Sequence, residues 1–212
     1  MAEMAVRTAE GAALDGDLTL PAHTRGVVLF AHGSGSSRHS PRNRAVGGAL
    51  NRHGLATLLV DLLTADEEVR DARTHDLRFD IGLLADRLAG IVDRLGGAPE
   101  TAGRPVGLFG ASTGAAAALV AAAGRPGDIA AVVSRGGRPD LAGPALIQVT
   151  APTLMLVGEL DTAVRELNEQ ARTVMTAHAE LRIVPGATHL FEEPGALDVV
   201  AEEAAAWFTT YL

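Results

Sequence analysis

The sequence predicts an α/β protein, with a mostly parallel, twisted sheet, helices on both faces and no separate lid domain. Short apolar runs alternate along the chain with longer segments of helical periodicity, which is the pattern of βα units. Most of these runs are continuously apolar, as strands covered on both faces are. The length of 212 residues, without a repeat or a linker, predicts one domain over residues 1–212.

Seven segments carry strand patterns. The first, residues 14–20, alternates apolar and polar side chains and predicts a half-buried strand. The other six are short apolar runs at residues 27–31, 55–60, 106–109, 129–133, 153–157 and 181–184. Because open parallel sheets gather function at the carboxyl ends of their strands, the residues after each run are the candidates for chemistry.

Five segments predict helices, at residues 41–53, 80–95, 113–123, 163–176 and 195–211. The second of them places apolar side chains at positions 81, 84, 88, 91, 92 and 95, on one helical face. Residues 62–78 are polar and are predicted to be irregular, and the sequence SRGGRPDLAGP is predicted to be a loop. Residues 135–151 have room for one or two helical turns, so we expect an open cleft rather than a deep lidded tunnel.

Composition excludes several classes of function. The net charge of −8 argues against binding to nucleic acid or an anionic membrane. The absence of Cys excludes disulfides, a thiolate nucleophile and Cys-ligated zinc, and all 18 basic residues are Arg, which excludes a Schiff-base lysine. Neither a secretory h-region nor a spanning apolar stretch is visible, so we expect a soluble cytoplasmic protein, from a GC-rich bacterial genome by its composition. The oligomeric state stays open.

The sequence GASTG at residues 110–114 fits the G-x-S-x-G pattern of a nucleophile elbow. In such an elbow a sharp strand-to-helix turn strains the backbone of the serine and lifts its oxygen into the cleft. The flanking glycines are needed because strand and helix approach too closely for a Cβ. Ser112 is therefore the predicted nucleophile, and the alternative is a serine that merely caps the following helix.

A serine hydroxyl needs a histidine to accept its proton, and the histidine needs a carboxylate to orient it. Asp161 and His189 follow the runs at 153–157 and 181–184, so Ser, Asp and His occur in the order found in α/β-hydrolases. Glu159 is a rival for the acid and Asp198 a more distant one. The alternative for His189 is a loop histidine with an ordinary structural partner.

The oxyanion of such a reaction needs two N–H donors. Thr113 begins the helix after the nucleophile, so its N–H is one candidate. Ser34, in the sequence HGSG after the run at 27–31, is predicted to supply the other, and His32 is predicted to support that loop. The neighbouring GSGSSR lacks the third glycine of a dinucleotide fingerprint, so no nucleotide cofactor is implied.

Four motifs, AHGSGSS, GLFGAST, LVGELD and PGATHLF, occur in this order across nearly the whole chain. Together they resemble the dienelactone-hydrolase-like group of α/β-hydrolases, and the segment FEEPGALDVVAEEAAAWF is similar to the last helix of that group. The resemblance implies the α/β-hydrolase fold. Dienelactone hydrolases proper use a cysteine nucleophile, and Ser112 occupies that place here, which implies a serine esterase-like hydrolase.

Two arginines, Arg135 and Arg138, follow the strand run at 129–133 and would lie near the cleft. We hypothesise that one of them lines the pocket and selects acyl groups that carry a carboxylate, by bidentate pairing. The alternative is that both are solvated or paired with nearby acids.

The resulting prediction is a carboxylic ester hydrolase for a small ester or lactone. Ser112 would form an acyl-enzyme, with His189 as base and acid and Asp161 as the orienting carboxylate. Neither a metal nor an organic cofactor is expected, and the expected partner is a small-molecule ester. The same triad could act as an acyltransferase or perhydrolase, which passes the acyl group to an alcohol, an amine or peroxide. A non-catalytic binding protein is the other alternative.

Overall fold

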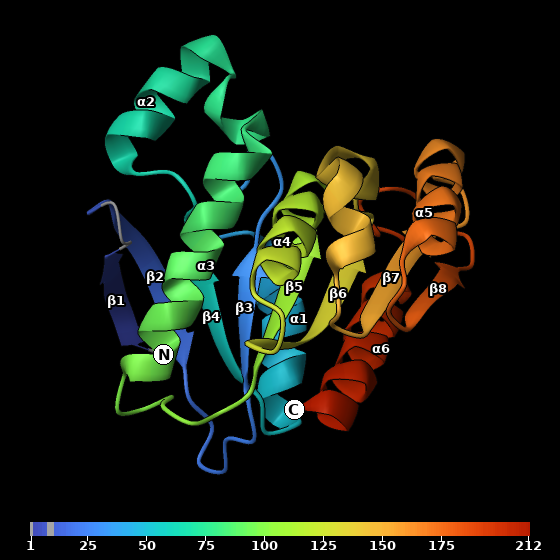
Figure 1. Ribbon diagram of the computed structural model, residues 1–212. Coiled ribbons are helices and arrows are strands. Elements are labelled where there is room, and N and C mark those ends of the chain that lie inside the picture. The colour runs from blue at the N-terminus through green and yellow to red at the C-terminus, as the bar shows by residue number, and fades with distance from the viewer. Residues whose placement is uncertain (1, 8–10) are drawn as a thin grey trace.

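The structure is a computed structural model that describes the backbone of residues 2–7 and all of residues 11–212. The strands in these residues form one sheet in the order β1-β2-β4-β3-β5-β6-β7-β8 (Figure 1). They are β1 (Ala2–Arg7), β2 (Ala13–Thr19), β3 (Val27–Ala31), β4 (Ala56–Val60), β5 (Val106–Ala111), β6 (Ile129–Arg135), β7 (Thr153–Gly158) and β8 (Ala179–Val184). The pairs from β4 through β8 are parallel, and β2 is antiparallel to both β1 and β4.

Helices cover both faces of this sheet. They are α1 (Pro41–Arg52), α2 (Ala65–Thr74), α3 (Ile81–Gly97), α4 (Thr113–Gly124), α5 (Thr162–Val174) and α6 (Ala196–Tyr211), with the 3-10 segments η1 (Leu77–Phe79) and η2 (Pro139–Gln148). In Figure 1, α3, α4, η2 and α5 lie in front of the sheet, whereas α1 and α6 lie behind it. Each layer packs its own cluster of buried apolar side chains against one face of the sheet.

The predicted fold class is confirmed, and the observed elements differ from the prediction in four places. A strand at Ala2–Arg7, which the sequence analysis missed, extends the antiparallel edge beside β2. Strand β6 continues through Arg135, because its backbone stays in register with Ala111 of β5. Residues 139–148 form η2, which is two helical pieces merged across a kink at Gly143.

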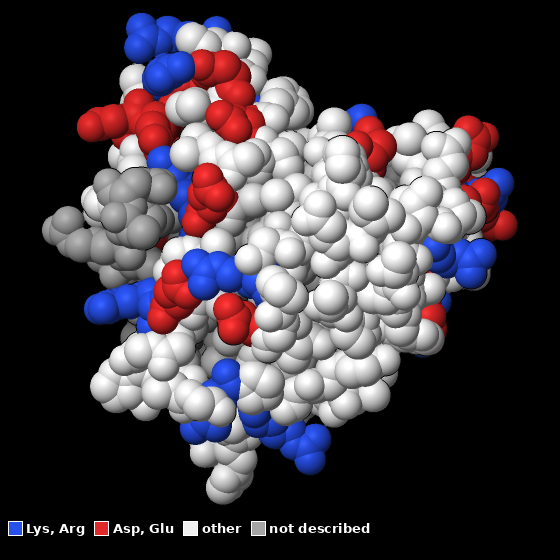
Figure 2. Space-filling view, viewed as in Figure 1, with Lys and Arg blue, Asp and Glu red and all other residues white. Residues whose placement is uncertain are grey.

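The fourth difference is α2 with η1, at residues that the sequence predicts to be irregular. This segment rises beyond the carboxyl ends of the strands, and acidic and basic side chains crowd it, in contrast to the surface over α4 and η2 (Figures 1 and 2). Asp71 is the one buried residue of α2, so an apolar stripe could not reveal the helix.

Polar contacts hold α2 in place instead. Thr64 and Glu67 form a reciprocal capping box at its first turn. Glu67 also accepts two hydrogen bonds from the guanidinium of Arg87 on α3, at 2.8 and 2.6 Å. Asp71 in turn accepts hydrogen bonds from the backbone and the side chain of Arg78. The pair Glu67–Arg87 therefore attaches the segment to α3, and the pair Asp71–Arg78 holds α2 and η1 together.

We expect Glu67→Gln to lower the free energy of unfolding at pH 7 by about 1–2 kcal/mol, because it removes a charge-assisted pair from a partly exposed site. The hydrogen bond from Arg87 lowers the pKa of Glu67 from 4.5 to about 2. A depressed pKa means that the carboxylate stabilises the fold above pH 4.5 and that this contribution is lost as the pH falls toward 2.

Urea unfolding of wild type and Glu67→Gln at pH 7 and pH 3 measures this difference, which should shrink at the lower pH. Asp66→Asn is the matched control, since Asp66 is an exposed acid in the same turn. A stability difference that is equal at both pH values would contradict the assignment.

Candidate active site

Ser112 lies between β5 and α4 in a strained backbone conformation, with φ 51° and ψ −119°. The two flanking glycines explain why it is held there. A Cβ at Gly110 would lie 2.7 Å from the backbone nitrogen of Ala115, and one at Gly114 would lie 2.7 Å from the carbonyl carbon of Ala31. Helix and strands therefore meet too closely for any side chain, as the GASTG sequence predicts. The side chain of Ser112 does not cap the helix.

His189 and Asp161 form a hydrogen-bonded pair. Nδ1 of His189 lies 2.6 Å from Oδ2 of Asp161, and the aspartate side chain is 14% exposed. Asp161 precedes α5 without capping it, so its carboxylate stays available to the histidine. Because a carboxylate only accepts hydrogen bonds, Nδ1 carries the proton in neutral His189 and Nε2 is left as the basic nitrogen.

Neither of the two rivals of Asp161 forms a hydrogen bond with His189. Glu159 accepts a hydrogen bond from the backbone N–H of Gly186 at 2.8 Å. Asp198 lies exposed in the first turn of α6. Of the three acids that the sequence left open, Asp161 is the one in contact with His189.

The end of β6 and the residues after it contact both Ser112 and His189. The N–H of Ser112 donates to the carbonyl oxygen of Arg135, and the N–H of Arg138 donates to the carbonyl oxygen of Ser112, both at 3.1 Å. Between these contacts, a Cβ at Gly136 would lie 3.4 Å from Cε1 and Nδ1 of His189. Serine and histidine thus lie against the same short piece of chain. Oγ of Ser112 makes no hydrogen bond with the residues that the structure describes.

The loop between β3 and α1 lies against the other side of Ser112. A Cβ at Gly33 would lie 3.2 Å from Cβ of Ser112. The N–H of Ser34 donates to Oγ1 of Thr113 at 2.8 Å, so the hydroxyl of Thr113 ties this loop to the start of α4. Thr113 is the first residue of α4, and its own N–H therefore has no partner within the helix. The sequence analysis missed the role of the Thr113 side chain.

His32 supports the same loop, as the sequence suggests. Its Nε2 accepts the N–H of Leu62 at 3.2 Å, so Nδ1 carries the proton and donates to the carbonyl oxygen of Gly33 at 2.9 Å. The histidine is 9% exposed and connects the β3–α1 loop to the chain that enters α2.

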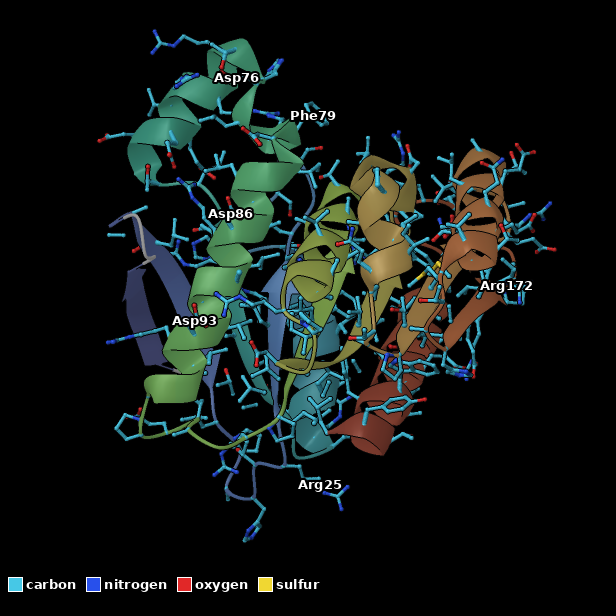
Figure 3. All side chains as sticks on the ribbon, in the orientation of Figure 1. Arg25, Asp76, Phe79, Asp86, Asp93 and Arg172 are labelled. Atoms are coloured by element: carbon cyan, nitrogen blue, oxygen red, sulfur yellow. The ribbon has the colours of Figure 1, made fainter. Side chains whose placement is uncertain are left out.

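A cavity of about 460 Å³ opens between the β3–α1 loop and the segment formed by α2 and η1. Hydroxyl and imidazole groups of residues 32–37 and 39–41 form one wall, and Glu68, Ala72 and Arg78 belong to the other. Gly33 lines this cavity and also abuts Ser112, so the cavity lies beside Ser112, although Ser112 itself is not part of its lining. Phe79, the last residue of η1, is 54% exposed (Figure 3). The sequence analysis assigned no part of the site to α2.

The two candidate arginines differ in how far they are buried and in whether they have a charged partner. Arg138 makes two hydrogen bonds to the carboxylate of Asp140, at 2.8 and 2.7 Å, and its side chain is 39% exposed. Arg135 is 8% exposed and makes no ion pair with the described residues. Arg42 of α1 is the charged neighbour that contributes to lowering the pKa of Arg135.

Among the side chains that the structure describes, no group of three or more His, Asp or Glu could hold a metal ion. None of the helices in residues 11–212 combines the length and the apolar character that crossing a membrane requires.

Comparison with known proteins identifies the family. Residues 14–210 match the dienelactone hydrolase family. The chain belongs to this family. It is also 57% identical over 197 residues to two curated proteins of Mycobacterium tuberculosis, each provisionally named a phosphoribosyl transferase. The match covers 93% of this chain and 44% of those proteins, so the chain spans less than half the length of these relatives.

Solved structures agree with the family. A crystal structure named dienelactone hydrolase, from Anabaena variabilis, is 57% identical, has a TM-score of 0.96 and is covered over 98% of its length by all of this chain. Est1E from Butyrivibrio proteoclasticus is 17% identical with a TM-score of 0.83, covering 100% of this chain and 99% of that one. An alpha-beta serine hydrolase homologue from Coxiella burnetii is 16% identical with a TM-score of 0.79, over 97% and 96% of the two chains. The latter two show the shared fold.

We expect Gly114→Ala to displace Ser112 and to destabilise the protein, because the added methyl group would overlap backbone atoms of Ala31 and His32. Overpacking of this kind costs about 1–3 kcal/mol or more. Urea unfolding measures the loss. Gly124→Ala is the matched control at the far end of the same helix, where a Cβ meets nothing within 4 Å.

The control variant should be as stable as wild type or more stable by about 0.5–1 kcal/mol, since alanine favours the helix. Equal stability of the two variants would contradict the account of the elbow.

Proposed function

We propose that this protein is a serine hydrolase that cleaves a small carboxylic ester or lactone through an acyl-enzyme on Ser112. The observation that carries the proposal is the conformation of Ser112, a residue with φ 51° at a strand-to-helix turn, beside a hydrogen-bonded His189–Asp161 pair. Such strain at a non-glycine residue is kept where the surrounding structure over-determines it, and it is concentrated at active sites. Membership of a hydrolase family supports the same chemistry.

In acylation, Oγ of Ser112 attacks the carbonyl carbon of the ester while Nε2 of His189 accepts the hydroxyl proton. The carbonyl π-bond opens and its electron pair moves to the oxygen, which becomes the oxyanion. When the carbonyl re-forms, the C–O bond to the leaving group breaks, and His189 donates the proton to the departing alcohol. Asp161 holds the ring in the required tautomer and stabilises its charged form.

Deacylation repeats these steps with water. His189 accepts a proton from the water molecule whose oxygen attacks the acyl carbon, and then returns it to Oγ of Ser112 as the acid leaves. The hydrogen bond between Ser112 and His189 forms when substrate is bound, as catalytic contacts often tighten only in the complex.

The oxyanion is proposed to accept hydrogen bonds from the N–H groups of Thr113 and Ser34. The first is free of helical partners at the start of α4. The second is held by Oγ1 of Thr113 at 2.8 Å, so that contact must be shared or released as the oxyanion develops. Removal of one such donor typically costs about 100- to 1000-fold in rate.

Two other activities have specific tests. Acyl transfer would use the same intermediate, and product analysis with an added alcohol, amine or peroxide measures how much of the acyl group avoids water. Phosphoribosyl transfer is the activity in the name of relatives more than twice as long. Pyrophosphate release from phosphoribosyl pyrophosphate with an acceptor base would support that activity here.

We expect p-nitrophenyl acetate and p-nitrophenyl butyrate to give a burst of p-nitrophenol, followed by turnover, with wild type and neither with Ser112→Ala. The reason is that the acyl-enzyme forms on Oγ of Ser112 and alanine has no nucleophile. Thr173→Ala is a control that removes a hydroxyl from an exposed end of α5 and should leave the burst unchanged. Turnover that survives in Ser112→Ala would place the chemistry on another residue.

Asp161→Asn should lower kcat by about 10³- to 10⁴-fold, because an amide can donate to Nδ1 and thereby favour the wrong tautomer of His189. Glu159→Gln is the matched control two residues away, where the side chain contacts the backbone of Gly186 instead of the histidine. Steady-state kinetics on the same esters measure both variants. An equal loss in both variants would contradict the assigned role of Asp161.

A further inference from the structure

Arg135 is a buried cation without a counterion. The residue is 8% exposed, and its Nη1 lies fully buried without a hydrogen bond. Among residues 11–212, no carboxylate or carbonyl oxygen accepts a hydrogen bond from its guanidinium. Buried arginines are normally paired, because removing an unpaired charge from water is unfavourable. This position therefore calls for an anion that the protein itself does not supply.

The charged residue that acts on Arg135 is another arginine, Arg42, which cannot serve as its counterion. Burial lowers the pKa of Arg135 to about 10, and repulsion by Arg42 adds to this shift, so the guanidinium remains charged at neutral pH. Arg42 lies in the first turn of α1 and pairs with Glu192 at 3.0 Å, while its Nε is buried without a partner. Two cations thus approach one buried region, and the carboxylate at its edge, that of Glu192, is exposed.

Three acids on the segments that surround Ser112 and His189 are already engaged. Asp140 binds Arg138 through both of its oxygens, and Glu193 accepts two hydrogen bonds from Thr188, at 3.1 and 2.6 Å. Asp161 is paired with His189. A rearrangement that brought one of them to Arg135 would have to break an existing contact.

Arg135 also lies next to the reaction centre. Its carbonyl oxygen accepts the N–H of Ser112, and the following residue, Gly136, abuts His189. Side chains alternate along a strand, so Arg135 points to the same face of β6 as Val133, which packs in the layer of α1 and α6. This orientation agrees with the proximity of Arg42 on α1.

We propose that Arg135 binds an oxyanion, a carboxylate or a phosphate group, at the carboxyl end of β6 beside Ser112, with Arg42 as the second cation of the site. The anion is either a substituent of the substrate or a free anion. The first of these sources rests on the proposed function, and the second does not. A carboxylate and a phosphate group each present a pair of oxygens that a guanidinium can bind in bidentate fashion.

The first experiment measures binding without catalysis. The Tm of wild type, Arg135→Met and Arg138→Met is recorded with sodium succinate, sodium phosphate or sodium chloride at equal ionic strength. We expect succinate or phosphate to raise the Tm of wild type and Arg138→Met by about 2–4 °C over chloride, and to have no such effect on Arg135→Met. Ser112→Ala should keep the shift, since it retains Arg135.

The same data separate binding from a structural role. In chloride, Arg135→Met should be as stable as wild type or more stable, because it replaces an unpaired buried charge by an apolar side chain. A clear loss of Tm in chloride, or an anion effect that persists in Arg135→Met, would overturn the proposal. If Arg135→Met does not fold, Arg135→Lys is the second variant, because it keeps the charge but lacks the planar guanidinium that binds two oxygens at once. The rise in its Tm with succinate or phosphate should be smaller than that of wild type.

The second experiment identifies the source of the anion. It compares kcat/KM for mono-p-nitrophenyl succinate with that for the neutral p-nitrophenyl butyrate. If the anion belongs to the substrate, Arg135→Met should lower this ratio by about 10- to 100-fold and Arg138→Met should leave it unchanged. An unchanged ratio together with a lost Tm shift supports a free anion. Absence of ester turnover in wild type would refute the proposed function, and the Tm series would still decide the anion site.

Discussion

The close approach of α4 to β3 and β5 is the constraint on which the rest of the site depends. Neither Gly110 nor Gly114 has room for a Cβ, and the alanines at 115–118 are fully buried against the sheet. Because the helix starts so close to the strands, the connecting residue has to turn sharply, and Ser112 takes a positive φ. The alanine-rich sequence of α4 is thus a packing requirement, and the strained backbone of Ser112 is its consequence.

Backbone contacts bring the remaining groups to that serine. The chain after β6 bonds to both backbone polar groups of Ser112 and passes against His189, which Asp161 holds from the end of β7. Four neighbouring strand ends therefore supply the site, as parallel sheets permit. The positions of these groups depend on the register of the sheet more than on the side chains around them, so substitutions on the outer helix faces should leave the site intact.

The segment of α2 and η1 is stabilised in a different way from the surroundings of Ser112. The pair Glu67–Arg87 attaches it to α3, the pair Asp71–Arg78 holds its two parts together, and it forms one wall of the cavity beside Gly33. Its charged surface stands apart from the weakly charged face over α4 and η2 (Figure 2).

The sequence by itself determined the fold class and the identity of the elbow, because continuous apolar runs and the GASTG spacing report local backbone geometry directly. It also singled out Asp161, although only the tertiary structure separates it from Glu159, since the two differ in orientation and not in type. Helix α2 escaped prediction because polar contacts to η1 and α3, rather than an apolar stripe, stabilise it. The contrast between Arg138 and Arg135 was likewise decided by tertiary structure. Burial and the absence of a partner depend on which side chains the fold brings together.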